Sequence, residues 1–204
     1  MKVAGNSICA IILAAGLSTR MGRPKMLLPW ESMTVIERVA ITILEAGIVN
    51  PIVVTGAEAE KVGALLEKYP VTCVFNPRYR NGEMLHSFQT GIAALDPACQ
   101  ATLMVLGDQP QIQPATVAAI LSDYQAVQAP LIIPSYRMRR GHPWIVRRAL
   151  WQNILAIQPP ATLHDFLLAH AGDIHYVNLE TPTILADLDT PDDYQKDRPG
   201  VQTS

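Results

Sequence analysis

The chain has 204 residues, of which 49% are hydrophobic and 17% are charged. This composition is typical of a globular protein and excludes a disordered chain. A chain of this length can bury roughly 70% of its unfolded surface, so it needs no disulfides or structural metal ions to fold. The formal net charge of −2 provides no broad basic surface, so we expect no nucleic-acid partner. We expect a single domain over residues 1–196 and a disordered polar tail at 197–204.

The cysteines and the first apolar run bear on the cellular setting. Cys9, Cys73 and Cys99 lie far apart and form no CxxC pair, which favours reduced thiols and a cytoplasmic location. The run ICAIILAAG after Lys2 has two interpretations, a short secretory signal or a buried strand. The polar interruption at residues 5–7 and the similar runs downstream favour the strand. No run reaches the roughly 18 apolar residues that span a membrane, so we expect no membrane association.

Short apolar runs alternate with helical patterns along the chain. In the first helical pattern Val35, Val39, Ile43 and Ala46 share one face, and Gly47 ends it. The predicted elements in chain order are strand 8–14, helix 33–46, strand 51–56, helix 58–68, strand 71–75, helix 84–95, strand 102–108, a helix from residue 114, strand 129–136, strands 143–148 and 174–179 at an edge or antiparallel, and helices 148–156 and 163–171. This alternation predicts an α/β protein with a mainly parallel sheet covered by helices on both faces.

Gly16, Arg20, Gly22 and Lys25 lie in the segment that leaves the first strand. Glycine lets backbone N–H groups approach an anion closely, and arginine and lysine neutralise phosphate charge. Lys25 is followed by Met26 rather than by serine or threonine, so the segment is not a Walker A loop. Ligands of open α/β sheets bind beyond the carboxyl ends of the strands. The segment therefore predicts a phosphate-binding loop, with an ordinary solvated loop as the alternative.

The longer pattern LAAGLSTRMGRPKMLLP resembles the signature loop of the MobA-like nucleotidyltransferases. The resemblance continues in order through NPRYRNGEMLHSFQTGIAAL, LGDQP, GHPWIVRR and DLDTPDDY, and so spans nearly the whole chain. Within this family the chain is similar to the molybdenum cofactor cytidylyltransferases. The resemblance implies a Rossmann-like, doubly wound fold of the nucleotide-diphospho-sugar transferase type, dependence on Mg²⁺, and transfer of a nucleoside monophosphate to a phosphorylated pterin.

The resemblance assigns roles by position in the motifs. The implied nucleotide-binding residues are Ala14, Ala15, Gly16, Ser18, Arg20, Gly22, Lys25, Asn76, Gly82 and Ser87. Arg20, Lys25 and Asp108 are the implied catalytic residues. Asp108 ends a buried strand and, with Asp189, is the implied Mg²⁺ site, for which Asp187 is the alternative second ligand. Simple capping or turn roles remain open for these aspartates, and also for the residues at 76 and 87.

Gly141, His142 and Arg140 match the turn near which relatives place the phosphorylated acceptor. Arg137 and Arg139 precede the same turn, and a solvated charged surface is the alternative for all three arginines. The segment QPPATLHDFLLAH at 158–170 lacks an arginine that molybdenum cofactor cytidylyltransferases carry there.

A further departure from the family pattern lies in the third loop. Relatives often place methionine directly after the glycine, whereas Glu83 stands between Gly82 and Met84. The register of Ser87 against the base is therefore open.

The expected function is Mg²⁺-dependent transfer of CMP from CTP to the phosphate of a molybdopterin-type acceptor, with release of pyrophosphate. Ala15 favours CTP, because guanylyl-transferring relatives usually carry a second glycine there. The alternatives are guanylyl transfer from GTP, a sugar-phosphate acceptor on the same fold, and a non-catalytic carrier that delivers the cofactor to a molybdenum hydroxylase.

Overall fold

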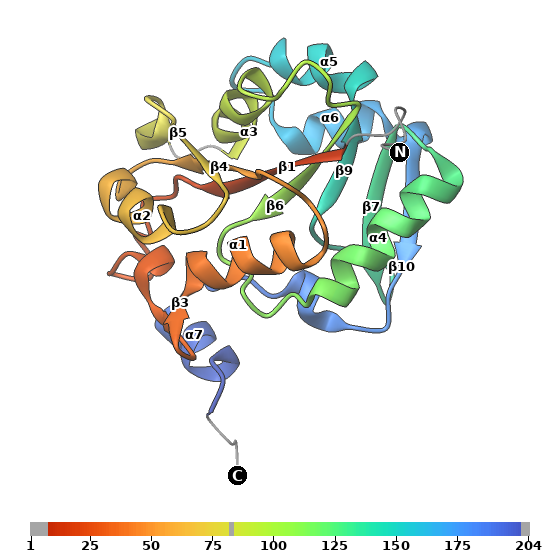
Figure 1. Ribbon diagram of the computed structural model, residues 1–204. Coiled ribbons are helices and arrows are strands. Elements are labelled where there is room, and N and C mark those ends of the chain that lie inside the picture. Colours follow the sequence, from red (N-terminus) through yellow and green to blue (C-terminus); the bar gives the residue numbers. More distant parts are fainter. Residues whose placement is uncertain (1–7, 82–83, 201–204) are drawn as a thin grey trace.

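The computed structural model describes residues 8–81 and 84–200 of the chain. Its main sheet has the strand order β10-β7-β9-β6-β1-β4-β5, with the short β8 paired to β7 (Figure 1). The strands are β1 (Ile8–Ala14), β4 (Ile52–Thr55), β5 (Thr72–Phe75), β6 (Ala101–Leu106), β7 (Leu131–Tyr136), β8 (Arg139–Arg140), β9 (Trp144–Arg147) and β10 (Ile174–Asn178), and a separate hairpin joins β2 (Pro29–Trp30) to β3 (Met33–Thr34).

Helices cover both faces of the sheet. On one face lie α1 (Val35–Glu45), α2 (Ala59–Leu66) and α4 (Pro114–Val127), and on the other lie α3 (Met84–Ala93), α5 (Trp151–Leu155) and α6 (Leu163–Ala169). The chain is completed by α7 (Pro191–Asp197) and five short 3₁₀ helices, Lys25–Leu27, Tyr79–Asn81, Arg148–Leu150, Ala171–Asp173 and Pro182–Leu185. Among the described residues, no helix is both long and apolar enough to cross a membrane.

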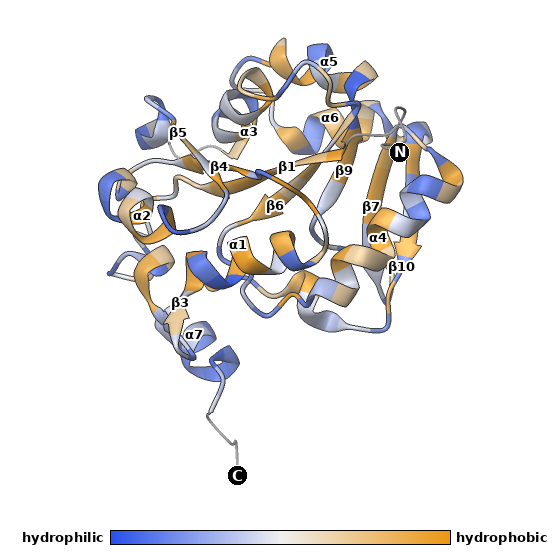
Figure 2. Ribbon diagram, in the orientation of Figure 1, coloured by the Kyte–Doolittle hydropathy of each residue, from blue (hydrophilic) through white to orange (hydrophobic). Residues whose placement is uncertain are grey.

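The central strand β1 explains why the protein has two cores. Successive strand residues point to opposite faces, so Ile12 packs under α1 whereas Ile11 packs under α3. Because both faces are covered, β1, β6 and β7 are apolar along most of their length (Figure 2). The predicted doubly wound α/β fold with a mainly parallel sheet is confirmed.

The strand order places a topological switch point beside β1. The chain runs from β1 to β4 and β5 on one side, and then returns to place β6 on the other side. Both neighbours are parallel to β1, so the residues after β1 and β6 leave the sheet at the same edge. This edge is where ligands of such sheets bind, because the loops separate there.

Two late strands define the side of the sheet beyond β6. The predicted strand at 143–148 corresponds to β9, which pairs antiparallel with both β6 and β7 inside the sheet. The predicted strand at 174–179 corresponds to β10, an edge strand parallel to β7. The predicted helix at 163–171 corresponds to α6, whereas residues 148–156 divide into a 3₁₀ turn and α5.

The end of the described chain packs against the first loop rather than against the sheet. Leu188 and Tyr194 join Met21, Leu28 and Trp30 in a small apolar cluster, and the Tyr194 hydroxyl donates to the Pro29 carbonyl at 2.6 Å. Figure 1 shows α7 beside β3 accordingly. Arg198 lies 5.9 Å from the Tyr194 ring centre, and residues 201–204 of the expected tail lie outside the described residues.

A disulfide joins Cys9 to Cys99, with 6.0 Å between their Cα atoms, whereas Cys73 is a free exposed thiol. This corrects the expectation of reduced thiols throughout. Cys9 pairs with Thr102 in the β1–β6 ladder, so the turn before β6 returns beside the start of β1. A sequence separation of 90 residues conceals this proximity.

Candidate active site

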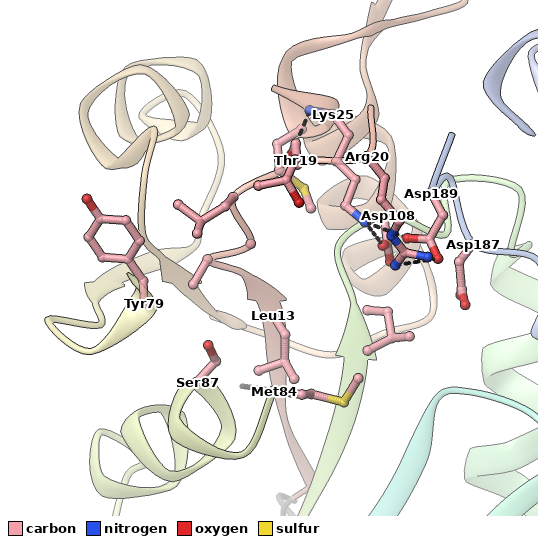
Figure 3. Close-up of a pocket in the computed structure, with 16 residues that line it drawn as sticks. Leu13, Thr19, Arg20, Lys25, Tyr79, Met84, Ser87, Asp108, Asp187 and Asp189 are labelled. Carbon is pink, nitrogen blue, oxygen red and sulfur yellow. Dashed lines mark hydrogen bonds and ion pairs between the residues drawn. The ribbon is translucent and has the colours of Figure 1, made fainter. Parts of the chain in front are cut away.

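A cavity of about 430 Å³ opens at the switch point (Figure 3). Its walls come from β1, the loop that follows it, α3, the end of β6 and the segment before α7. The lining residues are Leu13, Ala15, Gly16, Leu17, Ser18, Thr19, Arg20, Lys25, Met26, Tyr79, Met84, Ser87, Leu106, Asp108, Asp187 and Asp189. Charged side chains gather at one end, and Tyr79, Met84 and Ser87 lie at the other (Figure 3).

The charged end is built around Lys25. Its ammonium group contacts Asp108 Oδ2 directly and Asp189 Oδ1 at 3.3 Å. Arg20 Nη2 lies 2.9 Å from the second oxygen of Asp189. The side chains of Lys25 and Asp108 are only 12% and 14% exposed, whereas Arg20 is 71% exposed. The cluster therefore holds two cations and two carboxylates, with the more exposed cation, Arg20, at its rim.

Burial and charge act in opposite directions on the ionisable groups of this cluster. Burial lowers the pKa of the Lys25 ammonium, but the charges of Asp108 and Asp189 outweigh it and the pKa is raised. Burial and the neighbouring Asp108 charge raise the pKa of Asp187 to about 6, against the opposing hydrogen bond from Gln109. Lys25 is therefore a fixed cation at neutral pH, and Asp187 is a weaker acid than an ordinary solvated aspartate.

The loop after β1 is shaped by its own hydrogen bonds. Ser18 has a left-handed backbone with φ of 54°, its carbonyl accepts from Met21 and Gly22 N–H, and its hydroxyl accepts from Lys25 N–H at 3.1 Å. Gly22 also has a positive φ of 69°, which a residue with Cβ adopts at a cost. An added Cβ on Gly16 meets nothing within 4 Å, so Gly16 leaves its backbone open to the cavity.

The carboxylates are positioned by buried backbone and amide contacts. An added Cβ on Gly107 would lie 2.8 Å from the Leu13 carbonyl oxygen, so glycine lets β6 end close against β1 and places Asp108 at the cavity. Leu188 N–H donates to the Asp108 carbonyl at 3.1 Å. Gln109, which is almost fully buried, donates to Asp187 Oδ1 at 2.8 Å. Asp189 is thus left to contact the cations, while Asp187 is held by an amide.

The uncharged end of the cavity is partly apolar. An added Cβ on Gly56 would overlap the Ala15 carbonyl oxygen and lie 2.8 Å from Tyr79 Cβ, so glycine lets the end of β4 pack close behind these two lining residues. Ser87 lines the cavity from α3. Asn76 donates to the Ser87 hydroxyl at 3.1 Å but is itself completely buried behind the wall.

A second hollow of about 520 Å³ shares Asp187 and Asp189 with the first. Arg137 and Arg139 line it, whereas Arg140 instead donates to the Tyr176 hydroxyl at 2.8 Å. Neighbouring strand residues point to opposite faces, so only one of the β8 arginines can face the hollow. Arg140, the arginine predicted for acceptor contact, therefore does not line this hollow, whereas its neighbours Arg137 and Arg139 do.

Gly141 and His142 are built into the fold at this point. An added Cβ on Gly141 would overlap the Ile184 carbonyl oxygen, which also accepts from His142 N–H at 3.0 Å. The His142 ring stacks on Trp144 at 4.6 Å, and burial lowers its pKa to about 4. These residues hold the segment before Asp187 in place and line neither hollow.

The donor set fits a hard divalent cation that is shared with a substrate. Among the described residues, no group of three or more histidine, cysteine, aspartate or glutamate side chains is arranged to hold a metal ion. Mg²⁺, however, is commonly bound by only one or two carboxylates together with substrate phosphates. Asp108 and Asp189 supply such oxygens at the charged end.

Comparison with known proteins identifies the family. The model of the MobA-like NTP transferase domain matches residues 10–174. The chain belongs to this family. The molybdenum cofactor cytidylyltransferase of Escherichia coli K12 is 32% identical to it, covering 93% of this chain and 94% of the relative. The nicotine blue oxidoreductase of Paenarthrobacter nicotinovorans is also 32% identical, covering 70% of this chain and 72% of the relative. The predictions of the family and of a nucleotidyltransferase are confirmed.

Solved structures agree with this assignment. The crystal structure of Rv0371c from Mycobacterium tuberculosis H37Rv has a TM-score of 0.81 at 26% identity and covers 94% of this chain and 97% of its own. A crystal structure of Rv0371c in complex with manganese has a TM-score of 0.73 at 27% identity, covering 96% of this chain and all of its own. The fold prediction is therefore confirmed at the level of whole chains.

The predicted nucleotide-binding residues divide into three groups. Those that line the cavity are Ala15, Gly16, Ser18, Arg20, Lys25 and Ser87. Ala14, Gly22 and Asn76 lie behind or beside it, and Gly82 lies outside the described residues. Sequence reasoning missed Tyr79 and Gln109, although both occur inside motifs that carry the family resemblance.

Proposed function

We propose that the protein is a Mg²⁺-dependent cytidylyltransferase that transfers CMP from CTP to the phosphate of a molybdopterin-type acceptor and releases pyrophosphate. The observation that carries this proposal is the pairing of Lys25 and Arg20 with Asp108 and Asp189 at one end of the cavity. The name of the 32% identical relative supports the choice of CTP and of the acceptor.

The triphosphate would lie along the loop after β1. Lys25 and Arg20 would neutralise the charge that grows on the departing pyrophosphate, and backbone N–H groups near Gly16 would donate hydrogen bonds to phosphate oxygens. In the protein alone the carboxylates hold Lys25, so the cluster is nearly neutral before the nucleotide binds. A triphosphate with its bound cation would compete for these charged groups, so Lys25 would then lie beside the phosphates.

No general base is required for this reaction. A phosphate monoester has a second pKa near 6, so the acceptor is already largely dianionic at pH 7. One of its oxygens would bond to the α-phosphorus of CTP as the bond from that phosphorus to the bridging oxygen breaks, and the bond's electron pair leaves with pyrophosphate. The residues of the chain contribute positioning and charge stabilisation.

Asp108 and Asp189 would hold Mg²⁺, which would neutralise the triphosphate when bound. Support comes from Rv0371c, which has been crystallised with manganese, another hard divalent cation. Asp189 is preferred to Asp187 as the second ligand because it faces the cations, whereas Asp187 is held by Gln109.

The acceptor would enter through the second hollow. That hollow meets the first at Asp187 and Asp189, and Arg137 and Arg139 offer charge for a phosphate. A molybdenum hydroxylase that receives the product is the expected downstream partner.

The deciding experiment measures pyrophosphate release by purified protein with Mg²⁺, CTP and molybdopterin. Release that requires all three supports the proposal. Release with GTP but not with CTP would identify a guanylyltransferase. Release with a sugar phosphate in place of molybdopterin would identify a sugar-phosphate nucleotidyltransferase. Retention of the pterin without any pyrophosphate release would assign a carrier.

A further inference from the structure

Tyr194 is the buried side chain of α7, the short helix that begins two residues after Asp189. Its ring packs in the apolar cluster under α7, and its hydroxyl donates to the Pro29 carbonyl at 2.6 Å. The Arg23 guanidinium lies 5.4 Å from the ring centre, a distance at which cation–π attraction acts. Tyr194 therefore anchors α7 to the chain segment that follows β1.

The residues that contact Tyr194 lie on both sides of Lys25 in the sequence. Met21 and Arg23 precede the lysine, and residues 28–30 follow it. Lys25 thus lies between two stretches of chain that the same side chain holds. The anchor therefore restrains the segment that carries the Lys25 ammonium group.

The same anchor restrains Asp189 from the other side. Thr190 is the N-cap of α7: its hydroxyl accepts from Asp193 N–H at 3.2 Å, and the Asp193 carboxylate accepts from Thr190 N–H at 2.9 Å. This capping box joins the backbone after Asp189 rigidly to the helix. Holding α7 therefore also holds the carboxylate that contacts Arg20 and Lys25.

The two segments thus meet at two contacts of different kinds. One contact is the set of ion pairs in the cavity, and the other is the Tyr194 anchor, which lines neither hollow. A bound triphosphate with its cation would take Arg20 and Lys25 for its phosphate oxygens and Asp189 for its metal ion, so the ion pairs would no longer hold the segments together. The anchor is not involved in that exchange. This step rests on the function proposed above.

We propose that Tyr194 is a positioning residue, which keeps Asp189 opposite Lys25 after a nucleotide has displaced the ion pairs between them. It acts through these two residues and does not contact the substrate. A tyrosine with a merely structural role would stabilise the fold to the same extent, but its loss would not affect the binding of a triphosphate with its metal ion.

The test compares two tyrosine hydroxyl groups. Tyr194→Phe removes the hydrogen bond to Pro29 and keeps the ring in the cluster. Tyr69→Phe is the matched control, because the Tyr69 hydroxyl donates to Glu37 Oε1 at 3.2 Å and the residue lines neither hollow. Dissociation constants are measured for inorganic triphosphate in Mg²⁺ and in EDTA, with melting curves for every variant.

Each substitution should lower Tm by about 1–6 °C through the loss of one hydrogen bond. Tyr194→Phe should also weaken triphosphate binding by about three- to tenfold in Mg²⁺, and by less in EDTA, where Asp189 has no metal ion to hold. Tyr69→Phe should leave both dissociation constants at their wild-type values. Equal binding by Tyr194→Phe and wild type in Mg²⁺ would overturn the proposal, as would an equal loss of affinity in the Tyr69→Phe control or in EDTA.

Tyr194→Leu removes the hydroxyl and the ring together and should weaken Mg²⁺-dependent binding further. If Tyr194→Leu does not fold, Tyr194→Phe decides the question, because it keeps the packing of the ring. A wild-type protein that binds triphosphate equally in Mg²⁺ and in EDTA would refute the proposed metal site and this role together. A Mg²⁺ effect in wild type with an unaffected Tyr194→Phe variant would refute the role of Tyr194 alone.

Discussion

Replacing Asp108 by asparagine separates the proposed metal site from a structural role for this residue. The substitution preserves shape and removes one negative charge from a cluster in which Lys25 is only 12% exposed. A buried ion left without a partner costs about 3–5 kcal/mol. Here Asp189 remains 3.3 Å from the ammonium, and the new amide can still accept, so we expect a loss of about 1–2 kcal/mol. For a chain of this size that lowers Tm by about 2–8 °C.

Activity should fall much further than stability does. A carboxylate that holds the cation beside the triphosphate acts on the transition state, and its loss should lower kcat by about 10²–10³. The assay is pyrophosphate release titrated with Mg²⁺ and with Mn²⁺, at a temperature where melting curves show every variant folded. Higher Mg²⁺ or Mn²⁺ should rescue part of the activity.

Asp187→Asn is the matched control. Asp187 lines the same cavity, but its partner is Gln109 rather than Lys25, so its loss should affect turnover less. An Asp108→Asn variant with full activity and an unchanged Mg²⁺ dependence would refute the two-carboxylate site. If Asp187→Asn lowers turnover more than Asp189→Asn does, Asp187 rather than Asp189 is the second metal ligand.

Three further changes test other parts of the molecule. Lys25→Ala should lower kcat by about 10²–10³, whereas the affinity for CTP should fall less because Arg20 and the loop amides remain. Steady-state kinetics and a binding assay measure the two effects. Near-normal turnover would indicate that this loop is an ordinary surface loop. Wild type should prefer CTP to GTP in kcat/KM, and Ala15→Gly should reduce that preference by roughly tenfold; an unchanged ratio would contradict the steric argument. Burial raises the pKa of Glu37, but hydrogen bonds from Lys68 and Thr34 outweigh it and lower the pKa to about 2. Glu37 therefore stabilises the fold above its unfolded pKa of about 4.5. Because its partner Lys68 is 65% exposed and solvent screens the pair, about 1–2 kcal/mol is lost as the pH falls from 4.5 to 2, so Tm should fall more steeply with acid in wild type than in Glu37→Gln.

Periodicity was enough to predict most of the fold, and the strand-end rule predicted that the loop after β1 and Asp108 meet, whereas Asp189 was predicted only from the family resemblance. Buried strands such as β1 are continuous apolar runs, and the residues after β1 and β6 must meet because both strands are parallel neighbours. The antiparallel orientation of β9 was one of the two alternatives that the sequence left open, but its place between β6 and β7 was not predictable, since a short apolar run is the same pattern at an edge and inside a sheet. The Cys9–Cys99 disulfide was missed for a related reason, because it depends on which strands are adjacent.

The acceptor side shows a different limit. The β7–β8 hairpin turns at Arg137 and Met138, whose φ values of 48° and 65° are left-handed. Such turns usually carry glycine or asparagine, so the sequence contained no signal for a two-residue turn. Because the turn was not predicted, the strand register was unknown. It was therefore also unknown whether Arg139 or Arg140 faces the hollow.

The positions of Asp187 and Asp189 depend on packing against residues that lie far from them in the sequence. In the segment Asp187–Leu188–Asp189 only the middle side chain is fully buried, among Met21, Trp30 and other members of the apolar cluster under α7. Asp189 N–H donates to the Asp187 carbonyl at 3.0 Å, so the chain turns tightly at Leu188, whose side chain is buried while both carboxylates line the cavity. Met21, from the loop after β1 that carries Arg20 and Lys25, belongs to the same cluster, so the cations and the carboxylates are held by one packing unit. The sequence Asp187–Leu188–Asp189 thus presents its two carboxylates to the cavity only because the loop after β1 supplies the apolar surface against which Leu188 packs.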